Sequence, residues 1–180
     1  MVFVNSRAVA PEVDHPSAPE GVELDFDHDI ELVLAFLNTC DAEKGTEILD
    51  DPGQWQQWCI DQDLGKAPGV DAAREIRDAM RIAVSCGVRP RAGFETAWPV
   101  QVRLRNGVPM LTGGDAIGSV LVAATRLVHT GRWDRIKICP ADDCLWAFYD
   151  RSRNRSRTWC SMRVCGNREK ARSWRERHTS

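Results

Sequence analysis

Apolar residues recur at helical spacing in four stretches of the chain and therefore predict four helices. The stretches cover residues 27–40, 50–65, 70–87 and 115–131. Asp51 directly before Pro52 is typical of a helix start, and glycines at 87 and 131 are typical of helix ends. The positions expected to face a core are Ile30, Val33, Leu34, Leu37, Trp55, Trp58, Cys59, Ala72, Ile76, Ala79, Met80, Ala83, Ile117, Val120, Leu121, Ala124, Leu127 and Val128.

Two other stretches alternate apolar and polar residues and predict β-hairpins. In residues 100–111, Val100, Val102 and Leu104 point to one face, and Asn106-Gly107 is the strongest two-residue hairpin signal. In residues 136–149, two short strands flank a turn that a cysteine bounds on each side. The predicted fold class is therefore α+β, with a mixed helical and hairpin domain followed by a small treble-clef-like finger.

The composition changes along the chain and suggests three parts. Residues 1–21 contain three prolines and no apolar run, so they predict a disordered arm without a signal peptide. Residues 22–132 form the predicted mixed domain, and residues 133–180 the finger. Because no run reaches the roughly 18 apolar residues of a membrane helix, we expect a cytoplasmic protein with no membrane partner.

Four of the seven cysteines are spaced as a metal site. Cys139, Cys144, Cys160 and Cys165 read C-x4-C-x15-C-x4-C. Four thiolates match a closed tetrahedral Zn²⁺ site with Zn–S bonds of about 2.3 Å, although iron in a rubredoxin-like site is an alternative. A site with four protein ligands leaves no position for water, so one structural zinc ion is expected.

The other three cysteines stand apart from this pattern. Cys40, Cys59 and Cys86 lie in apolar surroundings and are expected to be buried free thiols.

Charge is distributed unevenly. Residues 151–180 hold ten Lys/Arg and two acidic residues, whereas residues 1–150 hold fourteen Lys/Arg and twenty-four acidic residues. Such asymmetry favours a polyanionic partner for the basic end, although a solvated basic tether is the plainer interpretation. Part of the surplus, from Arg157, Arg163 and Arg168, is expected to offset the formal −2 charge of a zinc ion with four thiolates.

The candidate nucleic-acid contacts form two groups. Arginines occupy alternate positions of the segment 151–157 and would share one side if it were extended. A helix after Cys165 would carry the second group, with Asn167 as its cap, Gly166 at positive φ, and Ala171 and Trp174 as its anchor on the finger. The candidate contacts are Arg151, Arg153, Arg155, Arg157, Arg168, Lys170, Arg172 and Arg175, of which Arg168, Arg172 and Arg175 could read bases.

The motifs around the second cysteine pair resemble the CGNR zinc-finger family. They are Ser152-Arg153-Asn154, Trp159-Cys160-Ser161-Met162 and Cys165-Gly166-Asn167-Arg168. The stretch "LAFLNTCD" and the helix with Trp55 and Trp58 resemble the ABATE domain that usually precedes this finger. The resemblance implies a zinc-binding, treble-clef-like finger in bacterial proteins classed as stress-linked transcription regulators.

These features support one leading function and two competing ones. The leading hypothesis is a DNA-binding regulator whose N-terminal domain senses a small molecule, binds a protein or forms a homodimer. The first competitor is a protein-interaction module in which zinc is purely structural. An enzyme is disfavoured, because no catalytic grouping is present and Asp142 and Asp143 read as exposed acids of a turn. The sequence leaves open DNA against RNA, the ligand, the oligomeric state and the pathway.

Overall fold

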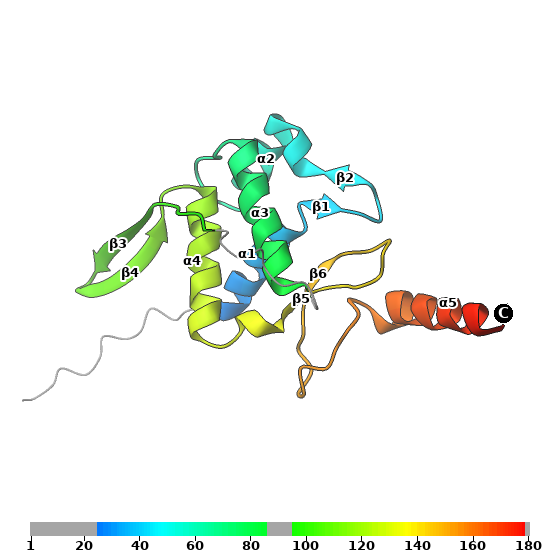
Figure 1. Ribbon diagram of the computed structural model, residues 1–180. Coiled ribbons are helices and arrows are strands. Elements are labelled where there is room, and N and C mark those ends of the chain that lie inside the picture. The colour runs from blue at the N-terminus through cyan, green and yellow to red at the C-terminus, as the bar shows by residue number, and fades with distance from the viewer. Residues whose placement is uncertain (1–24, 86–94, 179–180) are drawn as a thin grey trace, which may run out of the picture.

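A computed structural model describes residues 25–85 and 95–178 of the chain (Figure 1). Four helices form the body, and a fifth projects from it. They are α1 (Phe26–Leu37), α2 (Pro52–Asp61), α3 (Val70–Val84), α4 (Ala116–His129) and α5 (Asn167–His178). Three antiparallel hairpins pair β1 (Cys40–Asp41) with β2 (Thr46–Glu47), β3 (Val100–Arg105) with β4 (Val108–Gly113), and β5 (Ile136–Ile138) with β6 (Ala147–Tyr149). The predicted α+β class is confirmed.

The first four helices begin and pack largely as their sequences predict. Asp51 caps α2 by accepting a hydrogen bond of 2.7 Å from the backbone N–H of Gly53, with Pro52 in the first turn. Phe36 of α1 lies against Trp55, with ring centroids 6.1 Å apart. The buried side chains of α1–α4 form one core. No helix in the described ranges is both long and apolar enough to cross a membrane.

Some predicted inward positions differ from the structure. On α3, Ala83 is exposed, whereas Ala73 and Arg77 are buried. On α4, Val128 is exposed although the preceding Leu127 is buried, so Val128 lies on the outward face of the helix.

Of the isolated cysteines, Cys59 is buried as predicted, and burial raises the pKa of its thiol to about 11. Cys40 lies on β1 and is only half-buried, which corrects that prediction. Cys86, Gly87 and the predicted arm 1–21 lie outside the described residues.

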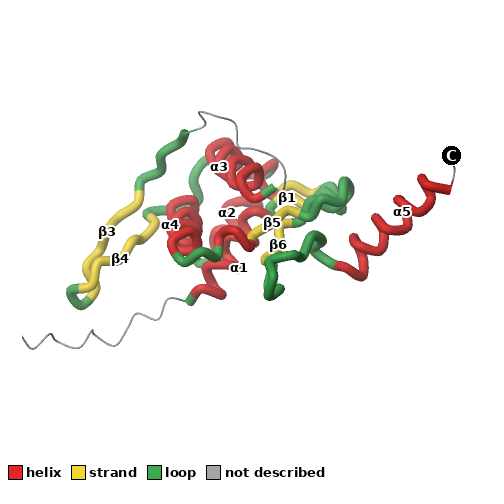
Figure 2. The backbone as a smooth tube through the Cα atoms, turned by 60° about the horizontal axis from the view of Figure 1, so that its bottom comes forward, coloured by secondary structure: helices red, strands yellow, loops and turns green. Residues whose placement is uncertain are grey.

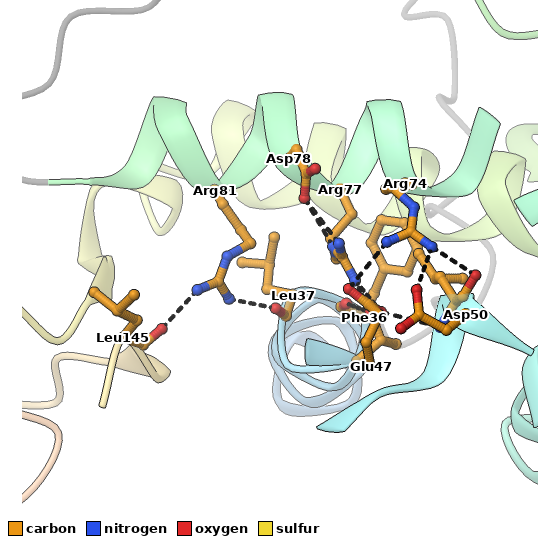
Figure 3. Close-up of polar contacts among 11 residues, drawn as sticks. Phe36, Leu37, Glu47, Asp50, Arg74, Arg77, Asp78, Arg81 and Leu145 are labelled. Atoms are coloured by element: carbon orange, nitrogen blue, oxygen red, sulfur yellow. Dashed lines mark hydrogen bonds and ion pairs between the residues drawn. The ribbon is translucent and has the colours of Figure 1, made fainter. Parts of the chain in front are cut away.

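Three arginines of α3 tie the elements of the body together (Figure 3). Arg77 is buried and donates to Glu47 at 2.6 Å and to the Thr39 hydroxyl at 3.1 Å. Arg74 donates to the backbone carbonyl of Leu49, and Arg81 reaches the carbonyls of Leu37 and Leu145 at 2.6 and 2.7 Å. Arg81 thus links the end of α1 to the loop that follows Cys144.

The β3–β4 hairpin extends away from the helices, as Figures 1 and 2 both show. Asn106 and Gly107 have φ of 53° and 81°, as the predicted two-residue turn requires. Val102 pairs with Leu111, and Val102 and Leu104 are 69% and 74% exposed. The predicted alternation is confirmed, but the apolar face that it creates is exposed.

The β5–β6 hairpin belongs to the core of the body and also leads to the cysteines. Ile136, Ile138 and Ala147 pack in the main core. The side-chain amide of Asn38, just after α1, accepts from the Ala147 N–H at 2.8 Å and donates to its carbonyl at 3.0 Å. The division of the chain at residues 132 and 133 stays a prediction, and this hairpin connects its two sides.

Candidate metal centre

The four cysteines predicted as ligands come together at one point. The sulfur atoms of Cys139, Cys144, Cys160 and Cys165 all lie within 4.8 Å of one another. The sulfur of Cys160 is 3.5 Å from those of Cys144 and Cys165. Tetrahedral zinc with 2.3 Å bonds would place its sulfurs about 3.8 Å apart. The donor set and its spacing fit one Zn²⁺ ion, and the cluster is compatible with a small zinc finger.

The first pair sits on the knuckle, residues 139–144, between β5 and β6. The N–H of Cys139 donates to the carbonyl of Trp146 at 2.9 Å, which continues the strand pairing. The N–H groups of Cys144 and Leu145 both donate to the carbonyl of Ala141, and Leu145 has a φ of 52°. This tight turn directs both thiols of the knuckle to the same side.

The second pair, Cys160 and Cys165, lies just before the last helix, α5. The Ser161 hydroxyl accepts from the N–H of Val164 at 3.3 Å and caps a π-helical turn, Met162–Gly166, that runs directly into α5. Helical backbone therefore begins at Met162, before Cys165, and continues as α5 from Asn167. Asn167 is not its cap, because Asn167 already has helical dihedrals and its side chain donates to the carbonyl of Arg163.

Gly166 does not have the predicted positive φ. A Cβ atom there would instead lie 2.5 Å from the sulfur of Met162 and 3.1 Å from Trp159 Cδ1. The glycine is needed because these side chains approach the backbone closely, not because of its own dihedral angle.

The pKa values of Cys139, Cys144 and Cys160 shift in different directions. Burial raises the pKa of Cys144 to about 11 and also raises the pKa of Cys160. Burial opposes ionisation of Cys139 as well, but hydrogen bonds from the backbone of Cys160 and Ala141 lower the pKa of Cys139. A Zn²⁺ ion bound by all four would displace the remaining protons.

Arg168 supplies positive charge at the cluster. Its guanidinium lies 3.5 Å from the sulfur of Cys165 and forms ion pairs with Asp143 at 2.8 Å and Glu43 at 3.5 Å. The hydrogen bond to Cys165 is the main reason that the pKa of Arg168 is raised. Arg157 donates to the carbonyl of Cys160, while the Arg163 side chain is exposed and pairs with no group in the described part of the chain.

The segment 151–157 is not extended, so its four arginines do not share one side. It turns around Asp150, which is completely buried and accepts from the Lys137 ammonium at 2.7 Å and from the N–H groups of Ser152 and Arg157 at 2.9 Å. Burial opposes ionisation, but these donors outweigh it and hold the pKa of Asp150 well below its usual range.

The arginines of this segment diverge as a result. Arg151 pairs with Asp27 at 3.1 Å, and Arg155 lies 3.9 Å from Asp134. Arg153 is exposed and forms no ion pair within residues 25–85 and 95–178. Asp150 was not predicted as a structural centre; its only signal in the sequence is an acid between the second strand and an arginine-rich segment.

Helix α5 extends away from the body and buries none of its residues (Figures 1 and 2). Trp174 is 56% exposed and stacks on His178, so it is not the predicted anchor. Arg172 pairs with Asp142 of the knuckle at 3.0 Å, and Lys170 and Arg175 are exposed. Asp142 and Asp143 are exposed, as predicted, and hold Arg172 and Arg168.

Comparison with known proteins agrees with this geometry. Residues 135–178 match the family model of the CGNR zinc finger. No curated protein matches the chain. The family match and the four-cysteine cluster together indicate that these residues form a zinc-binding finger of the CGNR type.

Proposed function

We propose that the protein is a non-enzymatic regulator that binds nucleic acid, most simply DNA, through its zinc finger. The observation that carries this proposal is α5, an unburied helix that projects from the body with cations along its length. Exposed cations that release counterions from phosphates are the main source of affinity in such interfaces.

The finger divides its cations into two roles. Arg168 and Arg172 bind the acids of the knuckle and fix the start of α5. Lys170 and Arg177 lie on the exposed helix, where they can meet phosphates. Arg153 would add a contact from the segment 151–157. Base reading by Arg168 or Arg172 would first require that their ion pairs open.

The body is proposed to be an ABATE-like domain of a cytoplasmic protein, in which it senses a small molecule, binds a protein or forms a homodimer. Support comes from the direct links between the body and the finger. Asn38 bonds the backbone of Ala147, the first residue of β6, and Arg81 donates to the carbonyl of Leu145, which directly follows Cys144. An effector on the body would therefore act close to the metal centre.

The test measures binding of zinc-loaded protein to a mixed-sequence duplex by fluorescence anisotropy as a function of salt. Contacts to roughly five phosphates predict a log–log slope of about −4.5. Replacing Lys170 and Arg177 together with Gln should bring the slope closer to zero by about 2, because two phosphate contacts are lost. Lys66→Gln, on an exposed loop of the body, is the matched control and should leave the slope unchanged. No binding to either DNA or RNA would end the proposal.

A protein-interaction module is the second candidate. Met162, Val164 and Trp174 of the finger are all about half exposed, which favours a protein partner with an apolar surface. Nuclease treatment before pull-down separates the two functions. Capture of a partner that survives nuclease and is lost in Trp174→Ser supports this second candidate.

A further inference from the structure

A groove of about 520 Å³ lies between α1 and β6. Ile30, Leu34 and Ala35 form the wall on α1, and Trp146 and Phe148 form much of the opposite wall. Small-molecule sites typically have volumes of about 300–1,000 Å³ and mostly apolar walls with few polar groups. The size and lining of this groove therefore suit a small organic molecule.

Two guanidinium groups border the groove. Arg157 lies over the ring of Phe148 at 5.0 Å, and Arg151 lies over the ring of Tyr149 at 5.7 Å. Among the residues that the structure describes, Glu31 is the only acid in the lining. The lining is therefore net positive, and a cationic ligand is disfavoured.

Both guanidinium groups keep donors for a ligand. Arg157 uses Nε and Nη2 for the carbonyls of Trp159 and Cys160, and its Nη1 has no acceptor among the residues that the structure describes. Arg151 pairs with Asp27 through Nη2, but both side chains are largely exposed, and such pairs are worth little. A guanidinium with open N–H groups is well suited to a carboxylate.

We propose that this groove binds a small organic anion, a carboxylate with an aromatic or branched apolar body. The apolar walls hold the body of the ligand, and Arg151 and Arg157 hold its carboxylate. Asn38 also lines the groove, but both polar atoms of its amide already form hydrogen bonds with the backbone of Ala147. The choice of ligand therefore depends on its charge and its shape.

The position of the groove suits an effector site. Trp146 follows Cys144 by two residues, and Arg157 precedes Cys160 by three. A ligand that draws Arg157 toward the groove would pull on the backbone of one metal ligand. The inference rests on the sensor part of the proposed function and names its effector class.

The test titrates the zinc-loaded full chain with 1-naphthoate and with 1-naphthamide, a neutral molecule of nearly the same shape, by calorimetry. Naphthoate should bind at least tenfold more tightly than the amide. Arg151→Gln should weaken naphthoate binding by about threefold, and Glu31→Gln should tighten it by a similar factor, as expected for partly exposed charges. Arg103→Gln, on the distant β3 strand, is the matched control and should change nothing.

Three results would overturn the proposal. Equal affinity for the amide and the acid would mean an apolar surface without an anion site. An unchanged affinity in both charge variants would place naphthoate elsewhere. If naphthoate does not bind up to about 1 mM and Arg151→Gln binds the duplex more weakly, Arg151 and Arg157 contact nucleic-acid phosphates and not a small ligand. None of these results depends on the salt slope of the wild-type protein, so the two proposals can fail separately.

Discussion

At the scale of single residues, Arg168 should control how tightly zinc is held. Its guanidinium lies beside the Cys165 sulfur and is fixed by Asp143, so Arg168→Gln removes positive charge from a site with net charge −2. We expect about tenfold weaker zinc binding, as is typical for loss of a group that supports metal ligands. Competition with a chromogenic chelator measures this change. Arg163→Gln, an exposed arginine of the same finger, is the control, and equal loss in both variants would contradict the local role of Arg168.

Asp150 is a second residue whose effect can be predicted. In the wild type, Lys137 and the N–H groups of Ser152 and Arg157 donate to the two carboxylate oxygens of Asp150. In Asp150→Asn, one of these oxygens becomes an NH₂ group, which cannot accept a hydrogen bond, so at least one donor loses its acceptor. We expect unfolding to become easier by roughly 2–3 kcal/mol at pH 7, the range for hydrogen bonds to a charged group. Urea denaturation of the zinc-loaded protein measures this difference.

The pH dependence of the same variant follows from the depressed pKa of Asp150. A carboxyl with a folded pKa below its unfolded value, about 3.9, stabilises the fold fully above that value and loses the effect as pH falls below it. The difference between wild type and Asp150→Asn should therefore be constant from pH 7 to pH 5. Below about pH 4 the difference should shrink, because the unfolded carboxylate takes up a proton there. A difference that stays constant down to about pH 3 would mean that the pKa of Asp150 is not depressed, and one that grows as the pH falls from 7 to 5 would mean that it is raised.

At the scale of elements, Asn38 joins α1 to β6 by pairing with the backbone of Ala147 as a neighbouring strand would. Asn38→Ala leaves that N–H and carbonyl unpaired in a partly buried place, which should cost about 1–3 kcal/mol of unfolding free energy. Thermal unfolding monitored by circular dichroism tests this prediction. Asn154→Ala, in the exposed segment 151–157, should be neutral.

The sequence predicted the elements best where a strong periodic signal coincides with burial. The helices α1, α2 and α4 have apolar residues on a single face, and their starts have ordinary caps. The strands β1 and β2 were missed because two residues each are too few for alternation to be visible. On α3, a pattern based on apolar residues could not anticipate that Arg77 is buried, since Glu47 and Thr39 become its partners only in the folded chain.

At the scale of the whole molecule, the finger and the body share one hairpin, so removal of zinc should destabilise both. Ile136, Ile138 and Ala147 belong to the core of the body, and Cys139 directly follows β5. We expect a chelator to lower the thermal midpoint of the helical signal by several degrees, and renewed zinc to restore it. A helical transition that stays in place after complete zinc removal would show that the body folds independently.

Only part of the candidate site could be predicted from the sequence. The four ligands were accessible from spacing alone, because metal coordination imposes a short and regular pattern. The arrangement of the arginines was not, because it depends on acids from distant parts of the chain. Asp27 holds Arg151, Asp134 lies beside Arg155, and the knuckle acids hold the first cations of α5.

The π-helical turn continues without a break into α5, so the last helix is attached directly to the metal-binding residues. Cys165 lies within that turn, so the direction of the helix would depend on how the sulfur of Cys165 holds a zinc ion. A twelve-residue helix is about 18 Å long, so a tilt of about 10° at the metal would move its far end by about 3 Å. A small distortion of the coordination sphere would thus become a displacement about as large as the spacing between successive base pairs.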